Sequence, residues 1–257
     1  MKPPALLRPI AEADAVKKLG RAVNRTLGTR FSLVTWNMSK ARHADFFDDV
    51  ADVAAHADVV LLQEAVLHGD QAHTFHDESG FEWVMGQNFR HRTKAITTGV
   101  KTGSRAPSTW HAMLRSTDRE PFIRSHKSAL ATMYDLTKGK PALLVLNIHA
   151  INFVGTRKYK RQMTEVVKLI QAHKGPLIVA GDFNSWGPLR RRILSQAAQD
   201  LGLVRAPVAA RKLRHFNQVL DHIFYRGLEL LASKSMRHIR SSDHTPLWTE
   251  FQVQKDV

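Results

Sequence analysis

The 257-residue chain contains no cysteine. Disulfide bonds, thiolate metal sites and cysteine nucleophiles are therefore excluded, and the composition fits the cytoplasm, where disulfides are rare. The sequence also lacks any run near the roughly 18 consecutive apolar residues that a membrane-spanning helix needs. Prolines and acidic residues interrupt the N-terminal stretch where a signal peptide would have its apolar centre. We therefore expect a cytoplasmic protein with no transmembrane segment.

Acidic residues are scarce relative to basic ones. The chain has 38 Lys and Arg against 23 Asp and Glu, which leaves a formal net charge of +15. Such an excess favours polyanionic partners, nucleic acid first and an anionic phospholipid surface second. A basic balance is also found in proteins that are merely soluble, so the charge indicates a class of partner without establishing one.

The hydrophobic pattern predicts one α/β domain over residues 31–257, expected to be a monomer, preceded by an N-terminal arm over residues 1–30. We expect the arm to be extended, with one short helix over residues 12–23. Beyond it, the spacing of apolar residues predicts strands at 31–37, 58–64, 81–86, 94–102, 128–136, 142–150, 177–184, 219–227 and 246–253, and helices at 44–56, 158–172 and 189–201. The succession of strand, helix and strand predicts βαβ-like units within two largely antiparallel or mixed sheets.

Polar residues stand at the ends of the apolar strands. They are Asn37, Glu64, Asn147, His149, Asp182 and Asn184, with Asp221 within the strand over residues 219–227 and Asp243 and His244 just before the last strand. Singly, each fits a turn. Together they would leave uncompensated carboxylates close to a core unless a cation or a donor compensates them. An oxygen-rich set without cysteine suits Mg²⁺ or Mn²⁺ better than zinc.

Six segments carry a family resemblance. TWN, LLQE, NIH, GDFN, LDHIFY and SDHTPL, in this order, resemble the endonuclease/exonuclease/phosphatase superfamily with the DNase I-like fold, from about Phe31 to Phe251. The chain looks most like an uncharacterised bacterial branch that carries NIHAINF, AGDFN and DFVFYRGL-like segments. The resemblance implies a four-layered α/β/β/α sandwich of two mixed, mainly antiparallel sheets flanked by helices. It also implies a phosphoesterase that uses Mg²⁺ or Mn²⁺.

By this resemblance, three residues would form the metal site. Asn37 and Glu64 would be metal ligands, and Asp243 would complete or support the site. One departure concerns the abasic-site nuclease branch, which has Gly-Ile-Arg after TWN where this chain has Met38-Ser39-Lys40.

The resemblance assigns the remaining strand-end residues to catalysis. Asp182, with Asn184 beside it, would orient and activate the attacking water or hold a second cation. Asp221 would hydrogen-bond His244 and raise its pKa by favouring the imidazolium. His149 would face the phosphate and protonate the leaving oxygen.

Weaker candidates for substrate binding flank these motifs. Asn147 would either support His149 or complete a turn. Trp186 and Arg190 follow GDFN, where they would stack on and clamp a nucleic-acid strand, or else the arginines of PLRRRIL face solvent on a helix. The basic segments 90–94 and 210–216 are candidate phosphate contacts on loops.

Three functions remain open on the sequence. The leading one is a nuclease that hydrolyses DNA or RNA by one-step attack of water on phosphate. The alternative is a phospholipid or small-molecule phosphoesterase, although LDHIFY lacks the cysteine and arginine of the inositol-phosphatase signature and no exposed apolar hairpin for membrane insertion is evident. The third is a non-catalytic binding relative, which an intact set of site residues disfavours.

Overall fold

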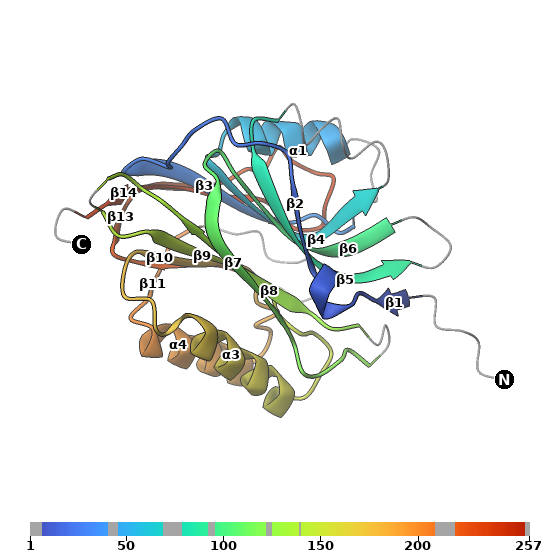
Figure 1. Cartoon of the computed structure of the whole chain (residues 1–257). Coiled ribbons are helices and arrows are strands. Elements are labelled where there is room, and N and C mark those ends of the chain that lie inside the picture. Colours follow the sequence, from blue (N-terminus) through green and yellow to red (C-terminus); the bar gives the residue numbers. More distant parts are fainter. Residues whose placement is uncertain are drawn as a thin grey trace.

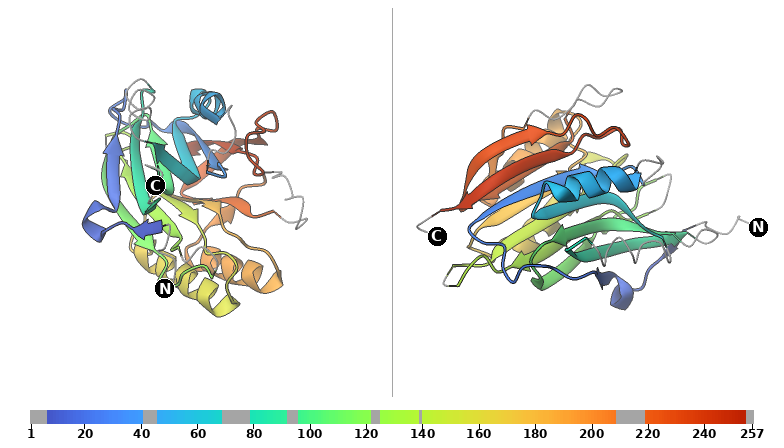
Figure 2. Two further views of the ribbon diagram at one scale, coloured as in Figure 1. Left: turned by 90° about the vertical axis from the view of Figure 1, so that its right-hand side faces the viewer. Right: turned by 90° about the horizontal axis from the view of Figure 1, so that it is seen from above.

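Two β-sheets lie face to face between outer layers of helices. The computed structural model describes residues 7–40, 46–68, 79–91, 96–121, 125–138, 140–208 and 219–254. Within these ranges, α1 (Phe46–Ala55) covers the outer face of one sheet, and α3 (Thr156–Ile170) and α4 (Pro188–Asp200) cover the other (Figure 1). The turned views show the same helices on opposite sides of the sheets (Figure 2). The four-layered fold expected from the sequence is confirmed.

The first sheet has eight strands in the described part of the chain. Their order is β1-β5-β6-β4-β3-β14-β13, with β2 also paired to β5. Its strands are β1 (Leu7–Pro9), β2 (Val16–Leu19), β3 (Arg30–Asn37), β4 (Val59–His68), β5 (Glu82–His91), β6 (Ile96–Ser104), β13 (Leu228–Ser235) and β14 (Leu247–Val253). Only β3 and β4 are parallel, and α1 connects them in a βαβ unit.

In the part of the chain that the structure describes, the second sheet has six strands, in the order β11-β12-β10-β9-β8-β7. They are β7 (Ser108–Arg115), β8 (Ser128–Tyr134), β9 (Leu143–His149), β10 (Leu177–Asp182), β11 (Val204–Arg205) and β12 (Asp221–Arg226). Here β9 and β10 are the parallel pair, and α3 connects them. Each sheet is therefore built around one βαβ unit, as the sequence pattern predicts.

Strand alternation divides the core into three layers. In β3, Leu33 faces the second sheet, whereas Val34 and Trp36 pack beneath α1. In β9, Val145 faces the first sheet, whereas Leu146 packs in the cluster that includes α3. Since successive side chains point to opposite faces of a strand, a polar residue two or four positions beyond these inner residues also faces the space between the sheets.

The predicted helix over residues 12–23 is wrong. A short 3₁₀ turn occupies Glu12–Asp14, and the next residues form β2, which pairs antiparallel with β5. Ala15 and Leu19 are buried, and pairing with the exposed edge of β5 satisfies the backbone of this segment. The described part of the N-terminal arm thus supplies β1 and β2 to the first sheet.

Besides β1, β2 and the two-residue β11, two longer strands were not predicted, and both lie at sheet edges. β7 ends the second sheet and β13 ends the first. Most of their side chains are exposed or only partly buried, so their sequences, STWHAMLR and LELLASKS, carry little of the apolar alternation that reveals a strand.

Asn147 joins the two sheets. Its side chain is 0% exposed, on the inner face of β9. The Nδ2 amide donates to the backbone oxygens of Leu62 (3.2 Å) and Lys101 (3.0 Å), and Oδ1 accepts a hydrogen bond from Gln63 Nε2 (2.8 Å). All three partners belong to the opposite sheet. The prediction that Asn147 binds substrate is therefore wrong, because the side chain is sealed between the layers.

We predict that Asn147→Ala lowers the free energy of unfolding by about 2 to 4 kcal/mol, since it removes buried hydrogen bonds that join the two sheets. Urea denaturation measures the change. Asn24→Ala is the matched control, because Asn24 is exposed and should change stability by less than about 0.5 kcal/mol. Equal stability of the two variants would show that Asn147 does not hold the sheets together.

Candidate active site

The inner-face residues at the strand ends converge between the two sheets. Asn37 ends β3 in the first sheet, Asp182 ends β10 in the second, and Asn37 Nδ2 donates to Asp182 Oδ2 at 3.0 Å. Asp182 lies opposite His149 on β9 and opposite Asp221 on β12 in the strand register. Four of the residues predicted from separate segments thus occupy one edge of the sandwich.

Glu64 reaches this edge through a β-bulge. Strict alternation after Val60 and Leu62 would point its side chain toward α1. A register shift between Leu62 and Ala65, with a positive φ of 51° at Glu64, redirects it. Its carboxylate lies 3.4 Å from Lys127 Nζ, just before β8 of the second sheet, and 3.6 Å from Lys40 Nζ.

Backbone strain is concentrated at the same edge. In the described ranges, the non-glycine residues with positive φ are Ser39, Lys40, Glu64, Phe153 and Asn184. They occupy the segments that follow β3, β9 and β10, and the bulge of β4. Residues other than glycine adopt this conformation at an energetic cost, and such residues cluster at functional sites. The strain therefore supports this edge as the functional one.

The glycine of the GDFN motif allows the close approach of β10 to β9. Gly181 has φ 142°, and a Cβ atom there would lie 2.0 Å from the backbone oxygen of Ile148. Any side chain would push the strands apart just before Asp182. Glycine at this position thus fixes the spacing between Asp182 and His149, whose closest side-chain atoms are 3.5 Å apart.

Asp221 orients His244 and holds it as a cation. His244 Nδ1 lies 2.7 Å from Asp221 Oδ2. Burial alone would lower the pKa of His244, but the charge and hydrogen bond of Asp221, with Asp182 and Asp243 nearby, outweigh burial and raise the pKa to about 10. Among the described residues, Nε2 makes no hydrogen bond. His244 therefore offers a charged donor to an anion.

Ser242, which sequence reasoning missed, ties this histidine loop to the first sheet. Its hydroxyl donates to the backbone oxygen of Asn37 (2.7 Å) and accepts a hydrogen bond from the backbone N–H of His244 (3.1 Å). This contact also brings the exposed Asp243 beside the end of β3.

The surroundings of His149 favour its neutral form, whereas protonation of the leaving oxygen would need the imidazolium. Burial, followed by the charge of Lys127, lowers the pKa of His149 to about 4, against the opposing charges of Asp182 and Glu64. Nε2 lies 3.1 Å from Lys127 Nζ. An ammonium group can only donate, so Nε2 accepts and the ring proton belongs on Nδ1.

Lys127 is the other residue that sequence reasoning missed. Besides His149, its ammonium lies 3.4 Å from Glu64 and 3.8 Å from Glu120. Burial would raise the pKa of Glu64, but the neighbouring positive charge, above all that of Lys127, outweighs burial and lowers it, so Glu64 is ionised at neutral pH. A lysine one residue before a strand belongs to none of the quoted motifs, so only the fold reveals its place.

Arg190 does not line the site. It is 3% exposed, and its guanidinium donates to the backbone oxygens of Ile151, Val154 and Asn184. The prediction that Arg190 clamps substrate is therefore wrong; the residue holds together the loops after β9 and β10. Trp186 is partly exposed beside these loops. Of the two basic loop candidates, Arg90 and His91 end β5, while residues 92–94 and 210–216 lie outside the described ranges.

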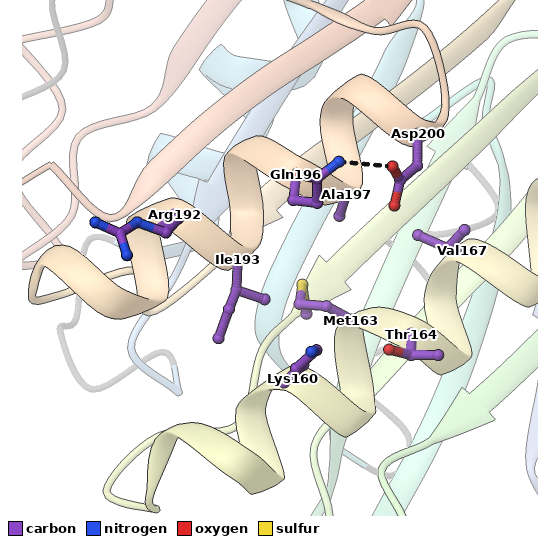
Figure 3. Close-up of a pocket in the computed structure, with 9 residues that line it drawn as sticks. All are labelled: Lys160, Met163, Thr164, Val167, Arg192, Ile193, Gln196, Ala197 and Asp200. Atoms are coloured by element: carbon purple, nitrogen blue, oxygen red, sulfur yellow. Dashed lines mark hydrogen bonds between the residues drawn. The ribbon is translucent and has the colours of Figure 1, made fainter.

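A cavity of about 300 Å³ lies elsewhere, between α3 and α4. Figure 3 shows Met163 and Ile193 between the two helices, with Lys160 beside Met163, Arg192 pointing away from them, and a hydrogen bond from Gln196 to Asp200. None of the predicted site residues lines it. The cavity belongs to the outer helical layer rather than to the convergent edge.

Residues 34–244 match the model of the endonuclease/exonuclease/phosphatase family. The chain belongs to this family. It is 36% identical over 234 residues to a UPF0294 protein of Erwinia tasmaniensis, covering 88% of this chain and 82% of that protein. The resemblance predicted from the six segments is thus confirmed.

Solved structures share the fold at low sequence identity. An endonuclease/exonuclease/phosphatase protein from Beutenbergia cavernae superposes with a TM-score of 0.66 at 18% identity, covering 88% of this chain and 72% of that one. The human Nocturnin catalytic domain, solved with a bound sulfate anion, gives a TM-score of 0.66 at 16% identity, covering 96% and 99%. At these identities the likeness establishes the fold alone. No described helix is long and apolar enough to cross a membrane.

Members of this family generally use divalent metals, and the donor atoms of the site suit one. No three His, Asp or Glu side chains in the described ranges form a ready metal site. Asn37, however, pairs with Gln63 in the sheet, next to the ionised Glu64. Because Asn37 gives its N–H to Asp182, its Oδ1 faces away from that residue and accepts a hydrogen bond from Ser39 N–H. One amide and one carboxylate thus come from adjacent positions of two paired strands, and their oxygen donors fit a hard cation.

A buried carboxylate oxygen at this edge has no partner among the described residues. It is Oδ1 of Asp221, whose Oδ2 binds His244. Native proteins rarely leave such an atom unsatisfied, so it calls for a water molecule or a ligand at this edge. The donor set and this unsatisfied atom are therefore compatible with binding of a divalent metal, which members of this family generally use.

We predict that His244 stays protonated across the neutral range in the wild type and that Asp221→Asn lowers its pKa, because burial then acts without the opposing charge. Histidine ¹⁵N NMR titration reads the pKa directly. Asp52→Asn is the control, since Asp52 contacts His56 and His238 instead. A wild-type His244 titrating near its ordinary value of about 6.5 would contradict the assignment.

Proposed function

We propose that the chain is a divalent-metal-dependent phosphodiester hydrolase that acts on DNA or RNA. The observation that carries this proposal is the cationic His244, oriented by Asp221 at 2.7 Å and with Nε2 available. It belongs to the same convergent edge as Asp182 and the ionised Glu64. An anionic ester would meet a fixed positive donor there, which is the arrangement that stabilises charge developing on phosphate.

The chain's own groups divide the work as follows. His244 donates to a phosphate oxygen and stabilises the negative charge of the transition state. Asp182 orients the attacking water and, by accepting hydrogen bonds from Asn37 and Asn184, fixes both amides. Lys127 places a second positive charge beside neutral His149. Neutral His149 is then a hydrogen-bonding group rather than the acid.

Asn37 and Glu64 would hold the metal, with Asp243 supporting them. A bound Mg²⁺ or Mn²⁺ would neutralise phosphate charge and favour departure of the leaving oxygen. Nothing in the arrangement requires a covalent intermediate, so we propose one-step attack by water.

Two observations support a nucleic-acid substrate. The net charge of +15 favours a polyanion. The related fold of human Nocturnin was solved with sulfate, an oxyanion with the tetrahedral shape of phosphate. A phospholipid or small-molecule ester is the alternative substrate, and a purely binding function the third possibility. The cytoplasmic location and the monomeric state stay predictions.

We predict that the purified protein cleaves DNA or RNA in Mg²⁺ or Mn²⁺ and loses this activity in EDTA. A panel of plasmid, single-stranded DNA, RNA, bis-p-nitrophenyl phosphate and phospholipid vesicles identifies the substrate. Binding of nucleic acid should weaken steeply with salt, as counterion release requires. Full turnover in EDTA would disprove the metal requirement, and cleavage of lipid alone would favour the alternative substrate.

We also predict that His244→Ala and Asp182→Asn each slow hydrolysis by at least about 100-fold, the scale of lost electrostatic or proton-transfer help. His238→Ala is the matched control, because His238 is an exposed histidine paired with Asp52. Its rate should equal that of the wild type. A near-normal rate in either site variant would remove that residue from the mechanism.

A further inference from the structure

Two aromatic residues stand on the loops that leave the site. Phe153 follows β9 and its His149, and Trp186 follows Asn184 of the GDFN motif. A single atom, Asn152 Oδ1, accepts both the indole N–H of Trp186 (2.7 Å) and the backbone N–H of Phe153 (2.8 Å). The two loops are thus joined at the aromatic residues, a few positions beyond the proposed catalytic groups.

The guanidinium of Arg190 packs against the ring of Trp186. The guanidinium of Arg190 lies 4.4 Å from the Trp186 ring centre and 4.6 Å from that of Tyr159. The N–H groups of Arg190 are held by loop carbonyls, and the Tyr159 hydroxyl donates to the backbone oxygen of Phe183 (3.0 Å). The stack of Tyr159, Arg190 and Trp186 therefore fixes the indole plane while leaving the side chain partly exposed.

Phe153 is held in an unfavourable environment. It has a positive φ of 51° and is 55% exposed, although a large apolar ring is normally more stable when buried. Strained, exposed residues persist where the surrounding structure imposes them, and they concentrate at ligand-binding sites. The hydrogen bond to Asn152 supplies that constraint here.

We propose that Trp186 and Phe153 form an aromatic platform on which a nucleobase next to the scissile phosphate stacks. This inference rests on the proposed nuclease function and specifies how its substrate is recognised. A fixed ring presents a flat surface to a planar group, and every base has a π-face, so such stacking tolerates any sequence. An aromatic side chain that inserts into a lipid surface does not need its ring plane to be fixed. The ring plane of Trp186 is fixed, by the hydrogen bond to Asn152 and the contact with Arg190.

The test compares two single-stranded oligonucleotides of equal length and charge, one with bases and one fully abasic. Fluorescence anisotropy measures their binding to the full chain in EDTA, which prevents metal-dependent cleavage. For the oligonucleotide with bases, Trp186→Ala should weaken binding about 10- to 100-fold, the scale of one lost base–aromatic stack. Phe153→Ala should act in the same direction. Binding of the abasic oligonucleotide should not change in either variant.

Two further variants separate stacking from general damage. Trp186→Phe retains a ring and should recover most of the lost binding. Trp110→Ala removes a tryptophan that is 42% exposed on β7, away from these loops in the chain, and should bind both oligonucleotides as the wild type does. The thermal unfolding midpoint of each variant identifies any that are poorly folded, in which case Trp186→Phe and Phe153→Ala decide the question.

The outcomes distinguish the platform from the proposed function. If Trp186→Ala and Phe153→Ala weaken both oligonucleotides equally or neither, the platform is wrong even where the protein still cleaves nucleic acid. If the wild type neither binds nor cleaves any oligonucleotide, the nuclease proposal itself fails. If the variants lose binding only to phosphatidylglycerol vesicles, the aromatic residues serve a lipid surface and the base-stacking proposal is overturned.

Discussion

The hydrogen bond from Asn37 to Asp182 is the contact on which the site depends. It spans 3.0 Å between the ends of two strands that belong to different sheets. Each strand is one member of the single parallel pair of its sheet. Neither sheet by itself holds the whole candidate site, because Asn37 and the ionised Glu64 come from one, while Asp182, His149 and Asp221 come from the other. Packing of the two sheets therefore assembles the candidate site.

The two histidines show how one site gives the same kind of side chain two different protonation states. His244 contacts a carboxylate and has its pKa raised to about 10, whereas His149 contacts an ammonium and has its pKa lowered to about 4. Both are buried, and burial lowers the pKa of each. At His244 the charge of Asp221 outweighs burial, whereas at His149 the charge of Lys127 adds to it. Environments that drive two titratable groups apart assign them different roles. One histidine is a permanent cation near neutral pH, and the other is a neutral hydrogen-bonding group.

Much of the fold could be predicted because a strand or helix that is buried on one or both faces leaves a strong pattern of apolar residues in the sequence. The buried strands β3, β9 and β10 were found for this reason, and the polar residues at their ends were found because each interrupts an apolar run. The edge strands β7 and β13 bury too little to leave such a pattern. The segment that contains β2 resembles a helix in sequence because its buried residues, Ala15 just before β2 and Leu19 at its end, are four positions apart. Only the pairing of β2 with β5 decides between the two structures.

Prediction of the site from the sequence has the same limit. Asn147 and Arg190 stand in the right motifs, yet both are turned into the core, where they join elements instead of meeting a substrate. Lys127 stands in no motif, yet it contacts two predicted residues. A one-dimensional pattern locates polar residues near a strand end. Which of them faces the open edge depends on bulges, strand register and the partner sheet.

The central proposal is that Asn37 and Glu64, at the edge they share with residues of the second sheet, hold one divalent cation. Mn²⁺ titration followed by electron paramagnetic resonance tests this claim without any assumption about substrate. Wild-type protein and Glu229→Gln, which alters an exposed glutamate on β13, should bind one ion with equal affinity. Glu64→Gln should lose most of that affinity. Equal Mn²⁺ binding by Glu64→Gln and the wild type would contradict the account.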